Sequence, residues 1–166
     1  MSVTLRKATP GDRQFILDLV PRLRAFGPPP LRPAEALDEA ERNALNRALD
    51  HPQPDHAIFV GELPEVGPAG IAYVETATDY FTGERHGHLA ILIVDESGEG
   101  QGVGKALLAA VEEWAAAQGY RFITLNVFAG NARARAVYER AGYSPDTVRY
   151  AKELNGSTAP RSRRSS

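Results

Sequence analysis

A glycine-rich turn between an apolar segment and an amphipathic segment constrains this chain more than any other feature. Residues 88–94 form a short run rich in branched apolar side chains, which is typical of a strand buried on both faces. The turn Gly98-Glu-Gly-Gln-Gly-Val-Gly104 follows and leads into a predicted helix that ends at Gly119. The apolar residues of that helix recur at helical spacing, at Leu107, Leu108, Val111, Trp114 and Ala115. A further strand over 120–128 completes a predicted right-handed crossover between parallel strands.

The segments before this unit predict two helices and three strands. Residues 3–8 alternate like a strand, and Asp12 is well placed to cap a helix that ends near Arg24, before Gly27-Pro-Pro-Pro30. A second helix is predicted over 33–49. Two strands then form a predicted hairpin, with bounds 57–63 and 70–76.

The segments after the unit predict one more helix and one more strand. Asn131 is a good N-cap for a helix that runs to Gly142, and residues 147–154 alternate like a last strand. The predicted order is β-α-α-β-β-β-α-β-α-β. This order describes an α/β (mixed α+β) fold, a mixed sheet with helices on both faces, in a single domain over 1–154.

Composition excludes several classes of protein. The 166 residues include no Cys, which excludes disulfide scaffolds, Cys-ligated metal and Cys nucleophiles, and no metal site is predicted. The net charge of −2 predicts no general attraction to nucleic acid or membranes. No apolar run approaches the length of a membrane helix, and the N-terminus lacks the layout of a signal peptide, so we expect a cytoplasmic protein. Residues 155–166 form a basic Ser/Arg tail that is predicted to be disordered.

The glycine turn predicts an anion site, because a helix start offers unpaired backbone N–H groups and a positive dipole end. Two common phosphate patterns fail. The P-loop pattern needs a glycine at 99 and a hydroxyl at 106, where the chain has Glu99 and Ala106. The dinucleotide pattern fails at Val103 or at Lys105, depending on the starting glycine.

The chain resembles the GCN5-related N-acetyltransferase (GNAT) superfamily over nearly its whole length. The family turn [QR]-x-x-G-x-[GA] is matched by residues 99–104 except at Glu99. The later motif N-x-x-A-x-x-x-Y-x-x-x-G-[FY] is matched at every position, by Asn131, Ala134, Tyr138, Gly142 and Tyr143.

This resemblance implies that acetyl-CoA lies between the strands ending near Val94 and Phe128. The pantetheine arm would pair with the backbone of residues 92–94, and the pyrophosphate would sit on the N–H groups of 101–105. Glu99 departs from the family, and we expect it to turn outward. The implied contacts are Leu92, Ile93, Val94, Glu99, Gly100, Gln101, Gly102, Val103, Gly104, Lys105, Asn131, Ala134 and Tyr138. Lys105 is equally compatible with an ordinary solvated residue.

The resemblance also implies two catalytic residues. An alkylammonium with a pKa near ~10.4 must lose a proton before it attacks, and His88 stands where relatives carry a Glu base. Tyr138 matches the family's proton donor to the leaving thiolate. Taken alone, His88 is also compatible with a strand-end histidine bonded to loop backbone, and Tyr138 with a core aromatic.

The acceptor is predicted only as a small-molecule amine or a peptide N-terminus. Acidic and aromatic groups for an amine are offered by Asp79, Tyr80, Phe81, Glu84 and His86, although an exposed polar loop is the alternative.

A homodimer is predicted because the chain after Gly142 is short for the two strands the family usually places there. Two rival functions stay open: a non-catalytic acyl-CoA-binding module, and a nucleotide-binding protein of another kind.

Overall fold

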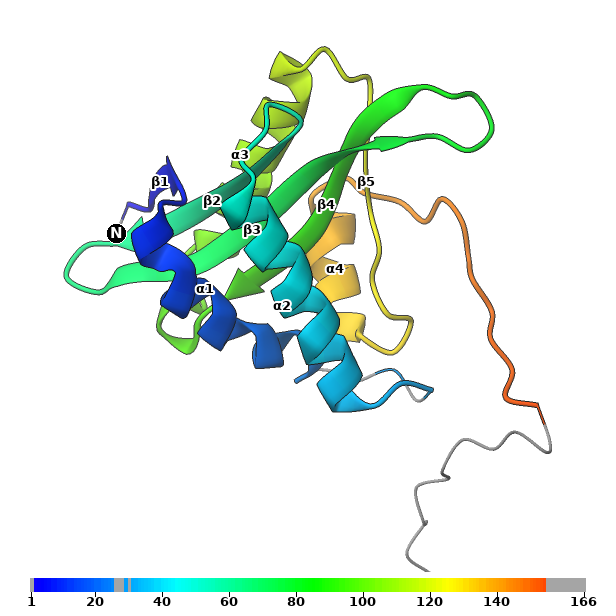
Figure 1. The fold of residues 1–166 in the computed structure, drawn as a ribbon, viewed down its shortest axis with the longest axis horizontal. Helices are drawn as coiled ribbons and strands as arrows, with labels where there is room; N and C mark the ends of the chain where they lie inside the picture. The colour runs from blue at the N-terminus through cyan, green and yellow to red at the C-terminus, as the bar shows by residue number, and fades with distance from the viewer. Residues whose placement is uncertain (1, 26–28, 30, 155–166) are drawn as a thin grey trace, which may run out of the picture.

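A five-stranded sheet forms the centre of the protein (Figure 1). The computed structural model describes residues 2–25, 29 and 31–154, so the predicted tail at 155–166 and most of the 27–30 break lie outside the described residues. The strands lie side by side in chain order, and all neighbours are antiparallel except β4 and β5. Their bounds are β1 Thr4–Lys7, β2 His56–Leu63, β3 Gly67–Thr78, β4 Arg85–Val94 and β5 Ile123–Leu125. The predicted mixed sheet is confirmed.

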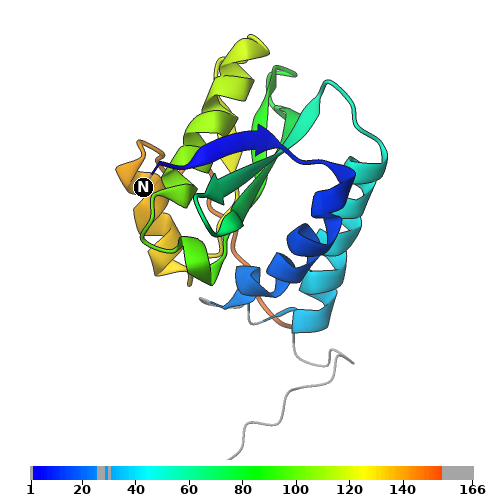
Figure 2. The same ribbon diagram turned by 90° about the vertical axis from the view of Figure 1, so that its left-hand side faces the viewer.

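Helices cover both faces of the sheet, as Figure 2 shows edge-on. One face carries α1 (Arg13–Leu19) and α2 (Ala34–Asp50), with the short 3₁₀ helices η1 (Pro10–Asp12) and η2 (Val20–Arg24) around α1. The other face carries α3 (Val103–Ala117) and α4 (Ala132–Arg140). A third 3₁₀ helix, η3 (Glu96–Gly98), follows β4. None of the helices in the described part of the chain is long and apolar enough to span a bilayer.

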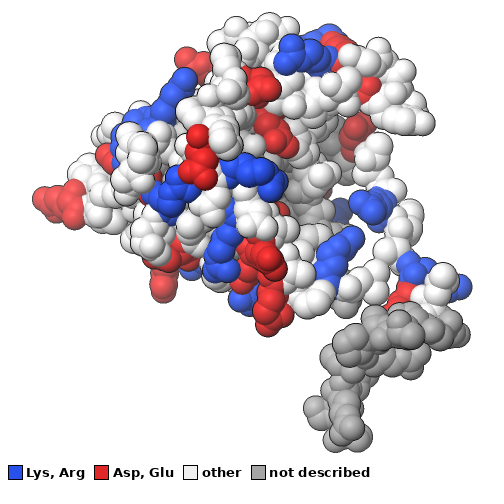
Figure 3. Space-filling view, viewed as in Figure 1, with Lys and Arg blue, Asp and Glu red and all other residues white. Residues whose placement is uncertain are grey.

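Two apolar cores result from the alternation of side chains along the strands. Ile71 and Tyr73 of β3 face α1 and α2, whereas Ala72 and Val74 face α3. Each core is closed by the apolar stripe of the helices above it. The core against α1 and α2 includes Ile16, Val20, Leu45, Ile91 and Ile93, and the core against α3 includes Leu89, Val103, Leu107, Leu108 and Val111. Figure 3 shows acidic and basic side chains interspersed over the visible face.

The first helical segment differs in detail from the prediction. Pro21 has no N–H to donate, and the chain tightens from α-helix to 3₁₀ helix at Val20. Asp12 precedes α1, but its carboxylate makes no cap bond to that helix and instead accepts from the Thr9 N–H at 2.7 Å. The same carboxylate accepts two hydrogen bonds from Arg6, at 2.7 and 2.8 Å, which fastens the start of this segment to β1.

Two predicted strands differ from the structure. The strand expected over 120–128 contains only β5, because the chain diverges from β4 after Leu125. The last strand, expected over 147–154, does not form, so the predicted order is wrong in its final β element. Val148 and Tyr150 are 69% and 91% exposed, so the side chains of this alternating segment do not pack on the described part of the chain. Figure 1 shows it leaving the body, and within the described residues the outer edge of β5 carries no strand.

Candidate active site

The site is built around a fork between β4 and β5. Their parallel pairing contains three residue pairs and ends at Leu89 and Leu125. Residues 91–94 of β4 continue beyond this point, and among the described strands they pair only with β3. An extra residue in β4, Ala90, shifts the register with β3, as in a β-bulge. Within the described chain the β5 side of residues 90–94 therefore has no partner strand, although the Val94 carbonyl accepts a hydrogen bond from Arg22. The predicted contacts at Leu92, Ile93 and Val94 lie in this segment.

The glycine turn connects the end of β4 to the start of α3. Gly100 and Gly102 have φ angles of 71° and 82°, in the left-handed region that favours glycine. The first backbone bond inside the helix runs from the Ala106 N–H to the Gly102 carbonyl at 3.0 Å. The N–H groups of residues 103–105 precede this bond and have no helical acceptor, so an anion can bind there.

Gln101, the first phosphate contact expected in the turn, has a backbone partner within the turn. Its N–H donates to the Gly98 carbonyl at 3.2 Å, because the turn closes on itself there. Among the described residues the Gly102 N–H has no acceptor, so the free N–H groups begin at Gly102 rather than at Gln101. A Cβ on Gly104 would meet only Val94, at 3.4 Å, so the backbone at this position is open to close approach.

Glu99 does not turn outward as expected. Its carboxylate accepts a hydrogen bond from Arg22 Nη2 at 2.6 Å and lies 3.6 Å from Arg133 Nη2. Arg22 Nε also donates to the Val94 carbonyl at 2.9 Å. Two guanidinium groups offset the charge of Glu99, which explains how a carboxylate can lie next to an anion-binding turn.

Helix α4 carries the second motif. Asn131 caps it, as predicted, by accepting a hydrogen bond from the Ala134 N–H at 3.1 Å. Tyr138 packs at the edge of the α3-side core, where Leu92 and Val94 also pack. Burial raises the pKa of the Tyr138 phenol, which keeps the hydroxyl protonated and able to donate.

His88 lies in the second-last pair of the parallel ladder, one residue before the fork. Its Nδ1 is 2.8 Å from the hydroxyl of Thr124, its partner on β5. On the other side, β3 places Glu75 directly opposite. Burial lowers the pKa of His88, and the nearby Glu75 carboxylate partly opposes this shift. The imidazole is therefore neutral at pH 7.

The bond to Thr124 decides whether neutral His88 can accept a proton. If Nδ1–H donates to the hydroxyl, Nε2 keeps its lone pair and can act as a base. If the hydroxyl donates to Nδ1, the ring carries its hydrogen on Nε2 and cannot accept there. A base therefore requires the first arrangement, with the Thr124 oxygen as acceptor.

Three residues near His88 were not predicted as site residues: Tyr73 and Glu75 of β3, and the neighbouring Glu41 of α2. The Tyr73 hydroxyl donates to Glu75 at 3.0 Å, and burial together with Glu75 raises the pKa of Tyr73. Burial, with the Glu75 charge next in importance, also raises the pKa of Glu41. A signal existed in the sequence: Glu75 is a charged residue on the apolar-facing register of β3, two positions after Tyr73.

The predicted acceptor loop lies at the other end of β4 from the glycine turn (Figure 1). The Asp79 carboxylate accepts hydrogen bonds from the N–H groups of Phe81 and Thr82 and from the Thr82 hydroxyl, and Glu84 pairs with Arg121. His86 is buried and stacks on Phe122 at 4.6 Å between ring centroids. The loop is thus held together by its own polar contacts.

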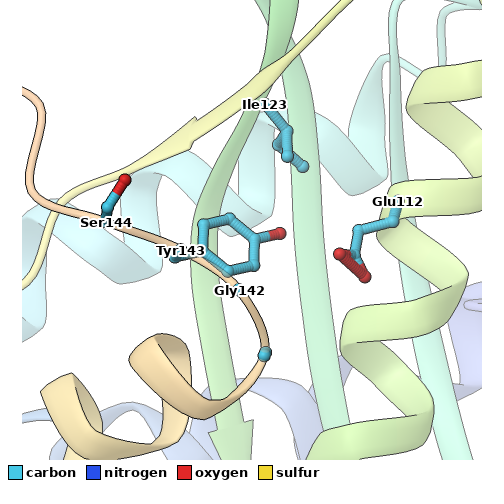
Figure 4. Close-up of a pocket in the computed structure, with 6 residues that line it drawn as sticks. Glu112, Ile123, Gly142, Tyr143 and Ser144 are labelled. Atoms are coloured by element: carbon cyan, nitrogen blue, oxygen red, sulfur yellow. The ribbon is translucent and has the colours of Figure 1, made fainter.

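A separate cavity of about 290 Å³ lies between α3, β5 and the segment that follows α4. Its lining residues are Glu112, Ile123, Ala141, Gly142, Tyr143 and Ser144. Figure 4 shows the Tyr143 hydroxyl pointing toward Glu112, and burial with this neighbouring charge raises the pKa of Tyr143.

Comparison with known proteins identifies the family. The model of the Acetyltransferase (GNAT) family matches residues 22–143, which contain the fork, the glycine turn and the Asn131 helix. The chain belongs to this family. Solved GNAT structures share its fold. A GCN5-related N-acetyltransferase from Ralstonia eutropha JMP134 superposes with a TM-score of 0.71 at 21% identity, covering 93% of this chain and 100% of that one.

Two further relatives have names that specify acceptors. AAC(6')-Iy, solved with the bisubstrate analogue CoA-S-monomethyl-acetylneamine, has a TM-score of 0.66 at 21% identity and covers 93% of this GNAT chain and 100% of its own. The mycothiol acetyltransferase of Amycolatopsis mediterranei (strain U-32) is 32% identical over 145 residues, which are 86% of this chain and 46% of that protein. The chain thus spans about half the length of this curated relative.

Proposed function

We propose that this protein is an acetyl-CoA-dependent N-acetyltransferase that transfers acetyl directly to a primary amine in a ternary complex. The fork between β4 and β5 carries the proposal. It joins an open backbone edge at 90–94, the free N–H groups of 103–105 and a neutral imidazole at His88 within one continuous structure. The domain is proposed to span 1–154.

The residues of the chain fit acetyl-CoA as a substrate. The glycine turn and the start of α3 offer backbone donors to the pyrophosphate, and Lys105 adds a positive charge next to them. The open edge of β4 can pair with the amide groups of the pantetheine arm, because these groups hydrogen-bond as a strand does. Asn131 and Ala134 border the same arm from the first turn of α4.

Three proton and charge tasks then fall to named groups. His88 Nε2 takes a proton from the ammonium, so the amine nitrogen can attack the thioester carbonyl carbon. His88 passes this first proton to bulk water. The backbone N–H of Val94 stabilises the oxyanion, because the backbone groups of Ile93 face β3. When the C–S bond breaks, Tyr138 gives its proton to the thiolate, and the second proton, lost by the attacking nitrogen, restores the phenol through water. The products are an N-acetyl amide and coenzyme A.

A small-molecule amine is the proposed acceptor. Glu75 and Glu41 lie on the α1–α2 face of the sheet, the face that carries His88, and both are only partly exposed. Their carboxylates favour a cationic substrate there. The names of the mycothiol and aminoglycoside relatives also specify small acceptors.

The test is release of coenzyme A, followed with a thiol reagent, in the presence of acetyl-CoA and a panel of amines. We expect release that depends on the amine and yields the acetylated amide by mass spectrometry. Binding of acetyl-CoA without release across a broad panel would support the rival function, a non-catalytic acyl-CoA-binding module. Homodimer formation is proposed separately, and light scattering of the purified protein measures it.

A further inference from the structure

One carboxylate at the entrance of the glycine turn is contacted from two other elements of the fold. Glu99 Oε1 accepts from Arg22 Nη2 at 2.6 Å and lies 3.6 Å from Arg133 Nη2. Arg22 belongs to η2, on the α1 side of the sheet, and Arg133 belongs to the first turn of α4 on the opposite side. The three charged groups therefore meet where the end of β4 passes into the turn.

Arg22 is held in place independently of Glu99. Its Nε donates to the Val94 carbonyl at 2.9 Å, which fixes the guanidinium at the last residue of β4. Its Nη1 makes no hydrogen bond to the part of the chain that the structure describes. The side chains of Arg22 and Glu99 are 28% and 34% exposed, so a ligand entering the turn can reach both.

The charges at this point favour a stronger anion than one carboxylate. Two guanidinium groups lie at the Glu99 carboxylate, the Asp95 carboxylate also lies near Arg22, and the start of α3 follows within a few residues. A guanidinium binds phosphate with the same two-pronged geometry that it uses for a carboxylate, and a phosphate group offers more acceptor oxygens and more charge. A phosphate bound at residues 103–105 would lie close to the same groups.

We propose that Arg22, with Arg133 beside it, binds a phosphate group of acetyl-CoA, and that Glu99 is a built-in competitor that holds Arg22 until the phosphate replaces it. This inference rests on the proposed function. Arg22 thereby supplies, from a distant segment, the basic side chain that position 99 lacks. Glu99 keeps two arginines from repelling each other in the free protein.

The experiment is isothermal titration calorimetry of acetyl-CoA with the full chain and four variants. Arg22→Met should weaken binding at least tenfold, and Arg22→Lys should weaken it less, because charge survives but the two-pronged contact is lost. Glu99→Gln should tighten binding about threefold or more, since it removes the competitor. The matched control is Arg24→Met, which removes an arginine of the same 3₁₀ helix that pairs instead with Asp38 at 3.0 Å. It should bind within twofold of the wild type.

Titration with acetyl-3′-dephospho-CoA separates the two phosphate sources. An equal loss with both ligands assigns Arg22 to the diphosphate, and a loss confined to acetyl-CoA assigns it to the 3′-phosphate. The inference is overturned if Arg22→Met and Glu99→Gln both weaken binding, because the pair would then be a structural link only. Unchanged affinity in Arg22→Met, with its folding verified by circular dichroism, overturns it as well. Failure of the wild type to bind acetyl-CoA would instead refute the proposed function.

Discussion

Asp12 offers a stability test whose size follows from the structure. Its carboxylate is 8% exposed and accepts hydrogen bonds from Arg6 and from the Thr9 N–H. Chiefly because of the Arg6 bond, the pKa of Asp12 falls from 3.8 to about 2. A difference of roughly 1.8 pKa units corresponds to about 2.5 kcal/mol at ~1.4 kcal/mol per unit. Asp12→Asn should therefore lower the free energy of unfolding by about 2–3 kcal/mol at pH 7.

The pH dependence has a defined sign. Because folding lowers this pKa, the contribution of Asp12 is fully present above its ordinary pKa near 4 and is lost as the pH falls through about 2. Urea unfolding of both proteins, measured from pH 7 to pH 2, should show the difference between wild type and Asp12→Asn shrinking toward zero. Part of the destabilisation by Asp12→Asn is offset, because Arg6 keeps its hydrogen bond to Glu62 at 2.7 Å.

Asp50→Asn is the matched control for this test. Asp50 also pairs with an arginine, Arg13, but its side chain is 54% exposed, so solvent screens the pair. We expect a cost below about 1 kcal/mol there. A cost for Asp12→Asn no larger than this, or a difference from wild type that does not change with pH, would refute the argument.

The remaining predictions concern the proposed active site. In the wild type, kcat/KM should rise with pH through an apparent pKa below the ordinary ~6.5, because burial lowers the pKa of His88. His88→Ala should remove this rise, and an unchanged pH–rate profile would exclude His88 as the base. Tyr138→Phe should lower kcat by about 10²–10⁴ with the acetyl-CoA affinity unchanged, as measured by steady-state kinetics and calorimetry; equal turnover would remove Tyr138 from the chemistry. Gly102→Asp should abolish the thermal stabilisation by acetyl-CoA, since it forces a side chain into φ 82° and adds an anion at the turn; a retained shift would contradict the assignment of the turn.

Features encoded in neighbouring residues could be predicted from the sequence. The glycine turn, the start of α3 and the Asn131 cap each depend on contacts within a few positions, and all three form as expected. The two helix-covered faces also follow from local periodicity. The last strand was wrong because alternation alone does not supply a surface for Val148 and Tyr150 to cover.

Features that depend on register between distant segments could not be predicted. Glu99 meets Arg22 across 77 positions, so its expected outward orientation was wrong although its unusual charge was noticed. His88 meets Thr124 across 36 positions and Glu75 across a hairpin whose register includes a bulge. No pattern of neighbouring residues contains these pairings, because strand pairing sets the contacts of His88 and the packing of η2 against β4 sets the contact of Glu99 with Arg22.

The bulge at Ala90 accounts for the fork on which the proposed function depends. It lies one residue after the last β4–β5 pair, and a bulge bends its strand and increases its twist. It also changes which side chains face α3. Leu89 faces α3, both Ala90 and Ile91 pack on the α1–α2 side, and Leu92 again packs toward α3. The inserted residue thus lies where β4 and β5 part and where β4 continues toward the glycine turn, while His88, before the bulge, keeps its place between β3 and β5.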